Sequence, residues 1–182
     1  MQTISTRVIA AFFEVLDTRN LEVAPLLHGL PLEEDVLREG VQRISWDAAL
    51  TILNRGSKLV GGPAHMGEVG RQFIDMPAFV NIGRILSYLA DTWQVYRVMR
   101  LWLAPSLIFS MPRHYQEHQD GTVTLSFAPP FSELDGASYL HMMAGVMEVL
   151  PTVIGAPPAT LSVEPKDGFF QFKISPASQT KG

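Results

Sequence analysis

The stretch SELDGASYLHMMAGVMEVLPTVIG (residues 132–155) decides the fold. Its apolar residues cover most of the circumference of a helix over residues 134–150, and a helix that is apolar all round is buried in a core. Three methionines lie in this helix, and methionine side chains fill irregular gaps and tolerate repacking. The helix is therefore either a plain core helix or one wall of an adaptable ligand pocket, and both readings stay open. His141 on the same helix is expected to be hydrogen-bonded rather than metal-bound.

Two Asp-Gly pairs predict hairpins on either side of this helix. Asp120-Gly121 separates LIFSMPRHYQEH from GTVTLSFAPP, and Asp167-Gly168 separates ATLSVEP from FFQFKIS. Asp-Gly favours tight hairpin turns, and the alternation in TVTLSF is typical of a half-buried strand. The sequence therefore predicts an α+β protein, with a helical N-terminal part packed on a small antiparallel sheet of about four strands and one buried helix between two hairpins.

The first hundred residues show helical spacing and helix-capping signals. Ser45 is placed to cap a helix that begins at Trp46, and Pro77 opens another. We expect one domain over residues 1–175, with a helical subregion (1–105), a hairpin-helix-hairpin subregion (106–175) and a linker or tail (176–182). The expected helices lie at residues 3–17, 21–27, 32–39, 45–60, 63–76, 78–90 and 93–103.

The composition excludes several classes of protein. The chain has 182 residues, a net charge of −4 and no cysteine, which rules out disulfides and thiolate chemistry. The sequence contains no basic block of the kind that indicates nucleic-acid binding. The longest apolar region is interrupted by Asp91, Arg97 and Arg100, so no membrane span is predicted. With no signal peptide recognised, we expect a cytoplasmic protein.

Catalytic and metal-binding patterns are not found in the sequence. HExxH, GxSxG, P-loop and GxGxxG motifs do not occur, and the glycines of GGPAHMGEVG (residues 61–70) follow no strand. His114 and His118 share a strand face, but four strand residues span about 13 Å, too far for a shared zinc ion. Ser132, Glu133 and Asp135 begin a helix and are better explained as caps. The chain is therefore not expected to be an enzyme or to hold a metal.

Aromatic and methionine residues are concentrated between residues 73 and 109. Arg97 and Arg100 lie one helical turn from Trp93 and Tyr96, where they could hold an acidic head group in an apolar cavity. The alternative is an ordinary core with two arginines that extend to solvent. The candidate ligand-binding residues are Phe73, Phe79, Tyr88, Trp93, Tyr96, Arg97, Met99, Arg100, Trp102, Met143 and Met147.

The N-terminal helix offers a second kind of site. Its apolar residues Ile4, Val8, Phe12 and Phe13 could pair with a second copy of the chain and form a homodimer, or they could pack on the chain's own core. A protein-interaction or dimerisation module without a ligand is therefore the alternative to a ligand-binding domain. In either case we expect a downstream signalling domain or partner protein.

Two stretches resemble known sensory domains. LLHGLPLEEDVLREGVQRISWDAALTILNR (residues 26–55) resembles the helical start of modules at the N-termini of bacterial histidine kinases, nucleotide cyclases and AraC-type regulators. The second half, from DGTVTLSFAPPF (residues 120–131) to FFQFKIS, looks like the C-terminal part of the heme nitric-oxide/oxygen-binding fold and its 4-vinyl-reductase-like relatives. The resemblance implies a non-catalytic bacterial sensory domain for signal transduction.

The sequence departs from the marks by which that family holds heme. The family's proximal histidine has no counterpart in WQVYRVMRLWL (residues 93–103), and its Tyr-x-Ser-x-Arg motif matches LSFAPPF (residues 125–131), where only Ser126 remains. We therefore expect no heme and no other cofactor, and a small apolar or amphipathic ligand in the interior instead. An atypical heme sensor that uses His141, His65 or His114 is the remaining alternative.

Overall fold

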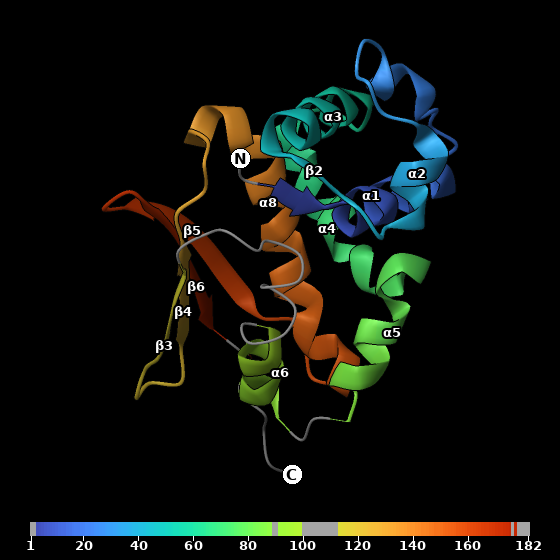
Figure 1. Cartoon of the computed structure of the whole chain (residues 1–182). Helices are drawn as coiled ribbons and strands as arrows, with labels where there is room; N and C mark the ends of the chain where they lie inside the picture. Colours follow the sequence, from blue (N-terminus) through green and yellow to red (C-terminus); the bar gives the residue numbers. More distant parts are fainter. Residues whose placement is uncertain (1–2, 89–90, 100–112, 176, 178–182) are drawn as a thin grey trace.

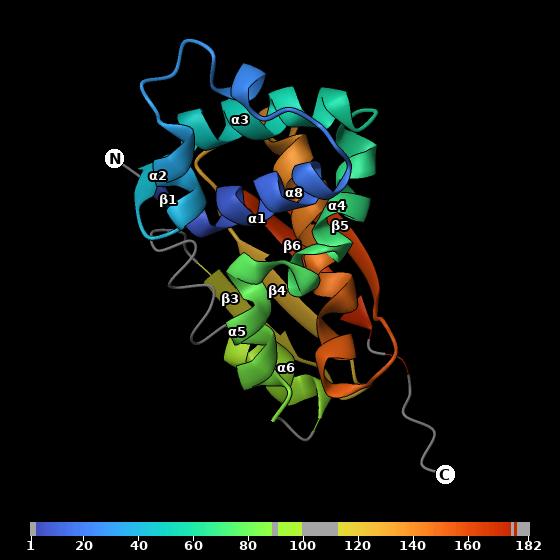
Figure 2. The ribbon, with the colours of Figure 1, turned by 90° about the vertical axis from the view of Figure 1, so that its right-hand side faces the viewer.

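The computed structural model describes residues 3–88, 91–99, 113–175 and 177 (Figure 1). A four-stranded sheet forms one side of the molecule, and helix α8 (Glu133–Val149) lies next to it in the centre. Beyond α8 lies a further layer of helices: α1 (Thr6–Thr18), α3 (Trp46–Leu59), α4 (Met66–Arg71) and α5 (Pro77–Leu86). Figure 2, turned by a right angle, shows the same order, with α1 and α5 in front of α8 and the sheet behind it. The central position of α8 explains why its sequence is apolar on every side.

The sheet confirms the predicted α+β class. Its strands are β3 (Arg113–Glu117), β4 (Val123–Phe127), β5 (Thr160–Lys166) and β6 (Phe169–Ser175), all antiparallel in the order β3-β4-β6-β5. Asp167 and Gly168 both have positive φ, at 52° and 78°, as the predicted two-residue hairpin requires. The alternate residues of β4 and β6 that face α8 are all buried: Val123, Leu125, Phe127, Phe170, Phe172 and Ile174.

Helix α8 begins at the predicted cap. Ser132 Oγ accepts the backbone N–H of Asp135 at 3.1 Å and donates to the Asp135 carboxylate at 2.6 Å, so these residues form a cap rather than a nucleophile and a base. Within the described residues, Glu133–Ile154 is the one helical stretch long and apolar enough to cross a membrane. Its faces are occupied by α3, α4 and β5, as expected of a core helix.

Glycines allow α8 and α4 (Met66–Arg71) to cross at very close range. A Cβ atom on Gly70 would lie 1.9 Å from the Met142 carbonyl oxygen, and one on Gly145 would lie 2.0 Å from the Gly67 carbonyl oxygen. No side chain fits at either position. The glycines of GEVG thus serve helix packing and do not cradle a phosphate.

The N-terminal segment differs from its predicted form. Residues 3–5 are not helical but form strand β1 (Thr3–Ser5), which pairs with β2 (Arg43–Ser45) in a two-stranded ladder. Helix α1 (Thr6–Thr18) follows, and Ser45 caps helix α3 (Trp46–Leu59) as predicted. Because Ile4, Val8, Phe12 and Phe13 are all buried in the chain's own core, this structure leaves none of them free for a second copy.

The remaining helices are shorter than the sequence predicts. Pro77 opens α5 as expected, but the helix ends at Leu86, and Asp91 caps α6 by accepting the N–H of Gln94 at 2.8 Å. Residues 89–90 and 100–103, where the sequence predicts further helix, and residues 107–112, where it predicts the start of the first hairpin, lie outside the described residues. The shorter elements are α2 (Glu34–Glu39), α5 (Pro77–Leu86), α6 (Thr92–Val98) and the 3-10 helices Ala24–Leu27, Pro63–His65, Phe73–Asp75 and Leu150–Ile154.

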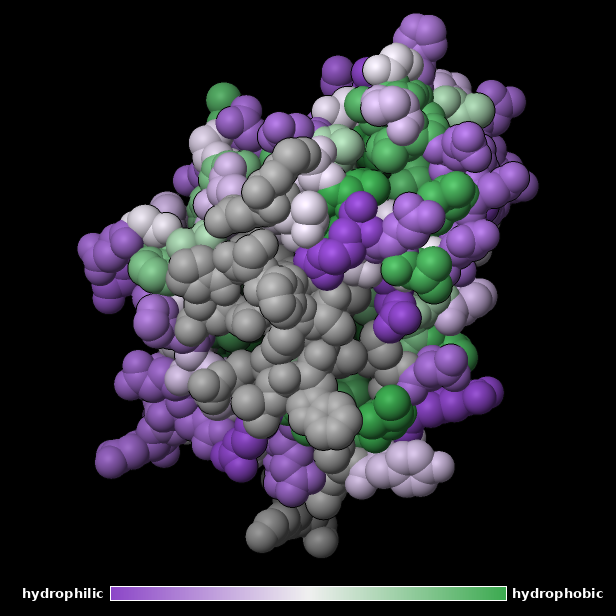
Figure 3. All heavy atoms as spheres, in the orientation of Figure 1, coloured by the Kyte–Doolittle hydropathy of each residue, from purple (hydrophilic) through white to green (hydrophobic). Residues whose placement is uncertain are grey.

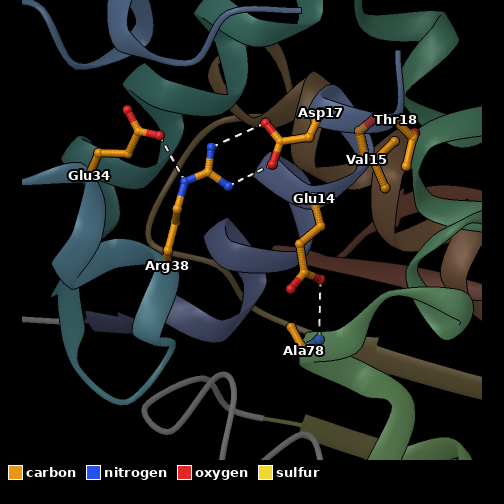
Figure 4. A network of polar contacts seen from close by, with 7 residues as sticks. All are labelled: Glu14, Val15, Asp17, Thr18, Glu34, Arg38 and Ala78. Carbon is orange, nitrogen blue, oxygen red and sulfur yellow. Dashed lines mark hydrogen bonds and ion pairs between the residues drawn. The ribbon is translucent and has the colours of Figure 1, made fainter. Parts of the chain in front are cut away.

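A polar network joins α1 to α2 and α5 (Figure 4). Arg38 of α2 donates to both carboxylate oxygens of Asp17 at 2.7 and 3.1 Å and to Glu34 at 2.7 Å. The hydrogen bond to Asp17 is the main cause that raises the pKa of Arg38. Glu14 accepts the N–H of Ala78 at 3.1 Å and so supplies the first turn of α5 with a carboxylate. The network fixes both neighbouring helices to α1.

Candidate functional site

Most of the predicted ligand-binding residues lie together in the core. Six of them belong to one continuous hydrophobic cluster that extends from the helical layer through α8 to the sheet. They come from the 3-10 helix Phe73–Asp75, from α5, from α6 with the residue after it, and from α8. All six are buried: Phe73, Phe79, Tyr96, Met99, Met143 and Met147.

Helix α6 connects the sheet to α8 through two of its side chains. The Tyr96 hydroxyl donates to the carbonyl oxygen of Met147 at 2.8 Å, and burial raises the pKa of this phenol. One residue further, Arg97 donates to Glu117 of β3 at 2.7 Å, and this bond lowers the pKa of the Glu117 carboxyl. The Tyr96 side chain therefore reaches from α6 to the backbone of α8.

The other candidates are not buried members of this cluster in the described structure, although Trp93 packs against it. Tyr88 is 89% exposed, and Arg97 is engaged by Glu117 at the surface. Trp93 is half-buried and lies near the turn of the first hairpin, since a Cβ on Gly121 would be 3.7 Å from its ring. Arg100 and Trp102 lie outside the described residues. The assignment of these eleven residues to a ligand stays a prediction.

The histidines lie outside the buried core, which bears on the fit to heme. All five are described: His28, His65, His114 and His141 are exposed, and half-buried His118 is hydrogen-bonded to Thr124 at 2.8 Å. A heme iron held from the core by histidine needs an imidazole that reaches the core. The residues present therefore do not fit heme ligated in that way. Among the described residues, no group of three or more histidine, aspartate or glutamate side chains could hold a metal ion.

Ser126, which matches the serine of the Tyr-x-Ser-x-Arg motif, does not face the core either. It alternates with Leu125 and Phe127 on β4 and therefore lies on the opposite, outer face of the sheet. There it lines a hollow of about 250 Å³ together with His114 and Phe169, whose rings are 5.2 Å apart. The outer face is thus the wrong side of the sheet for a group held against α8.

An aromatic trio that the sequence reading missed lies between α3 and α8. The ring centroids of Trp46, Phe131 and Tyr139 are 5.0 to 5.7 Å apart, and the Trp46 and Tyr139 rings meet edge to face. The Tyr139 hydroxyl and the Trp46 indole N–H are both buried without a hydrogen-bond partner among the described residues. Burial raises the pKa of the Tyr139 phenol. Two polar atoms in this trio therefore carry a desolvation cost that no described residue offsets.

Removing the Tyr139 hydroxyl is expected to stabilise the protein. Tyr139→Phe keeps the ring contacts and should raise the free energy of unfolding by about 1 kcal/mol, because an unpartnered buried hydroxyl costs about 1–3 kcal/mol. The matched control is Tyr96→Phe, which leaves the Met147 carbonyl unpaired and should lower the free energy of unfolding by a similar amount. Urea unfolding measures both. If Tyr139→Phe destabilises the chain as much as Tyr96→Phe does, the Tyr139 hydroxyl has a partner in solution.

Hollows lined by described residues lie on the sheet and along its edge, and three of them bear on function. The largest, about 590 Å³, covers the outer face of the sheet and is lined mainly by hydroxyl, amide and charged side chains, in keeping with the mostly hydrophilic left margin of the molecule in Figure 3. The hollow beside Ser126 lies on the same face. The third, about 320 Å³, is a mainly apolar groove between α8 and β5. The sequence analysis predicted none of them, because each forms only where separate strands or a strand and a helix meet.

Comparison with known proteins gives a match at the level of structure. No protein-family model and no curated protein matches the sequence. A mutant of T. Tengcongensis H-NOX superposes with a TM-score of 0.63 at 18% identity, covering 99% of this chain and 100% of that one. The Fe(II) unliganded H-NOX protein from K. algicida gives 0.59 at 14% identity, with coverage of 98% and 100%.

A further H-NOX structure, from work on heme distortion in that family, gives a TM-score of 0.63 at 16% identity and covers both chains completely. The likeness therefore spans the helical part and the sheet alike, and it is not confined to the hairpin-helix-hairpin segment. At this level of identity the match concerns the path of the chain and not its side chains. The chain has an H-NOX-like α+β fold.

Proposed function

We propose that this chain is a non-catalytic sensory or regulatory input domain of a signalling protein, which binds a small apolar or amphipathic molecule in its interior without histidine-ligated heme. The H-NOX-like fold over the whole chain supports a sensory role. The observation that carries the ligand class is the position of the histidines, all of which lie outside the core, while methionine and aromatic side chains fill it. Bacterial origin and a cytoplasmic location belong to the same proposal.

The methionines support an adaptable interior. Met99, Met143 and Met147 belong to the same buried cluster as Phe73 and Phe79. An unbranched thioether side chain repacks at low cost, so this cluster can make room for a guest more easily than one built of branched residues. A ligand that binds only the folded chain stabilises it by RT ln(1 + [L]/Kd).

Native mass spectrometry and thermal unfolding test the ligand directly. The probes are octanoate, palmitate and indole, added to the full chain at millimolar or saturating concentration. At least one is expected to give a one-to-one adduct and to raise the melting temperature by several degrees, and Met143→Ala or Met147→Ala should change that shift. Val41→Ala, which alters an exposed side chain outside the candidate set, is the control. If no probe gives an adduct and no probe raises the melting temperature, the ligand is removed from the proposal.

A hemin titration tests the cofactor part. Because no histidine reaches the core, hemin is expected to give a broad absorbance spectrum without the sharp Soret band of a histidine-ligated heme. Single His→Ala variants at positions 65, 114 and 141 should leave that spectrum unchanged. A sharp Soret band that one of these substitutions abolishes would show histidine ligation and overturn this part of the proposal.

A further inference from the structure

We propose that the outer edge of β5 and the groove between β5 and α8 bind an extended peptide segment of a partner protein, which adds to the sheet as a fifth strand. This inference concerns a partner and does not depend on the interior ligand proposed above. It rests on an open strand edge, an apolar groove beside that edge, and a carboxylate at the end of the groove.

The strand edge offers backbone groups with no strand to receive them. In the described structure β5 pairs with β6 alone, and Figure 2 shows it at the margin of the sheet. Lys166 and Phe169 close the two-residue hairpin, so Lys166 and every second residue before it exchange hydrogen bonds with β6. The intervening residues Leu161, Val163 and Pro165 therefore direct their backbone polar groups outward. Pro165 has no N–H to leave unpaired, as suits an edge strand.

The same three residues line the groove. Leu161, Val163 and Pro165 lie on one side of the 320 Å³ space, and residues of α8 lie on the other. The strand and the helix run in opposite directions, since Ala159 just before β5 donates its N–H to the carbonyl oxygen of Glu148 near the end of α8. The groove follows β5 from Leu161 to Pro165. The α8 residues that line it are Glu133, Ala137, Leu140, His141 and Ala144, with Phe170 at its base. An added strand would hydrogen-bond to Leu161 and Val163 and place its inward side chains against α8.

The negative charge of Glu133 at one end of the groove favours a peptide that carries a positive charge. Glu133 is exposed and forms no ion pair with any described residue, and its neighbour Leu134 is 87% exposed. A segment with apolar residues at alternate positions and a lysine or arginine near Glu133 complements both features. A small apolar molecule could fill the groove, but it would leave the outward backbone groups of Leu161 and Val163 unpaired.

The probe is a set of synthetic eight-residue peptides in which Val, Leu, Ile or Phe alternate with Ser or Thr and one end carries Lys. They are titrated into the full-length, isotope-labelled chain and followed by nuclear magnetic resonance. At least one peptide is expected to bind with micromolar affinity and to slow amide exchange at Leu161 and Val163 tenfold or more. Peptides with Glu in place of the Lys should bind at least fivefold more weakly.

Two substitutions separate the groove from the charge. Ala144→Phe fills the groove and should weaken binding tenfold or more, and its unfolding curve shows whether the variant folds. Glu133→Gln should weaken binding about fivefold, whereas Glu68→Gln on the exposed side of α4 is the matched control and should leave it unchanged. The dependence of binding on Glu133 also decreases with salt if charge attraction is the cause.

Three results would overturn the proposal. The first is that no peptide binds. The second is that peptides bind without protecting the amides of Leu161 and Val163, which means that the groove takes side chains or small molecules and the edge takes no strand. The third is self-association in sedimentation that Ala144→Phe abolishes, which assigns the edge to a second copy of this chain. These three results do not depend on whether the interior-ligand experiments succeed or fail.

Discussion

Replacing Gly70 by alanine is expected to lower the free energy of unfolding by about 3 kcal/mol, the upper part of the usual range for overpacking a core. The added Cβ would lie 1.9 Å from the Met142 carbonyl oxygen and 3.1 Å from the Val146 backbone nitrogen. Both are backbone atoms of a helix, so they cannot rotate away as the end of a side chain can. Helices α4 and α8 would have to move apart, which breaks the packing on both sides of α8.

Gly67→Ala on the same short helix is the matched control. A Cβ there meets nothing closer than the His141 carbonyl oxygen at 3.6 Å, an ordinary contact. Alanine also favours helix by about 1 kcal/mol over glycine. The substitution should therefore leave the free energy of unfolding unchanged or raise it slightly. Urea unfolding of both variants decides the matter: equal effects of the two substitutions would show that the close crossing of α4 and α8 does not exist in solution.

Gly56→Ala is expected to destabilise the chain by about 2 kcal/mol, and a change in Phe12 should relieve most of that cost. A Cβ on Gly56 would lie 2.3 Å from Cζ and 2.6 Å from Cε1 of Phe12. Phe12 is fully buried, so its ring has little room to turn. Phe12→Leu removes the clashing atoms and by itself should cost about 1–2 kcal/mol through the cavity it leaves.

A double-mutant cycle measures the contact. If the ring and the Cβ compete for the same space, the variant carrying both changes should be more stable than the sum of the single effects predicts, with a coupling of about 1–2 kcal/mol. Gly29→Ala is unsuitable as a control, because Gly29 has φ of 74° and alanine would be strained there. Ala48→Gly tests the backbone effect in the same helix instead. Strict additivity of the Gly56 and Phe12 changes would contradict the packing of α1 against α3.

The hairpins and caps could be predicted because their signals are local. Asp167-Gly168 specifies its turn through the positive φ of two adjacent residues, and Ser45 and Ser132 cap helices through N–H groups three residues away. The largely buried position of α8 follows from its own sequence, since apolar residues cover most of its circumference. These features need no knowledge of the rest of the chain.

The site could be predicted only in part. Residue type alone placed Phe73, Phe79 and the methionines in the interior, because large apolar side chains are buried wherever they can be. Tyr88 shows the limit of that rule, since its ring is just as large and is exposed. The hydrogen bond from Tyr96 to Met147 joins residues 51 positions apart, and the local sequence around either residue does not predict it.

The sequence by itself determined the fold class, the two hairpins, the caps and the buried central helix, because turn geometry, capping and hydrophobic periodicity act over a few neighbouring residues. Tertiary structure decided which helices touch, why Gly70 and Gly145 must be glycine, where the five histidines lie, and that β5 is an edge strand beside α8. Each of these depends on the relative positions of segments that are distant in the chain. Such positions come from packing the whole core at once, which no local pattern encodes.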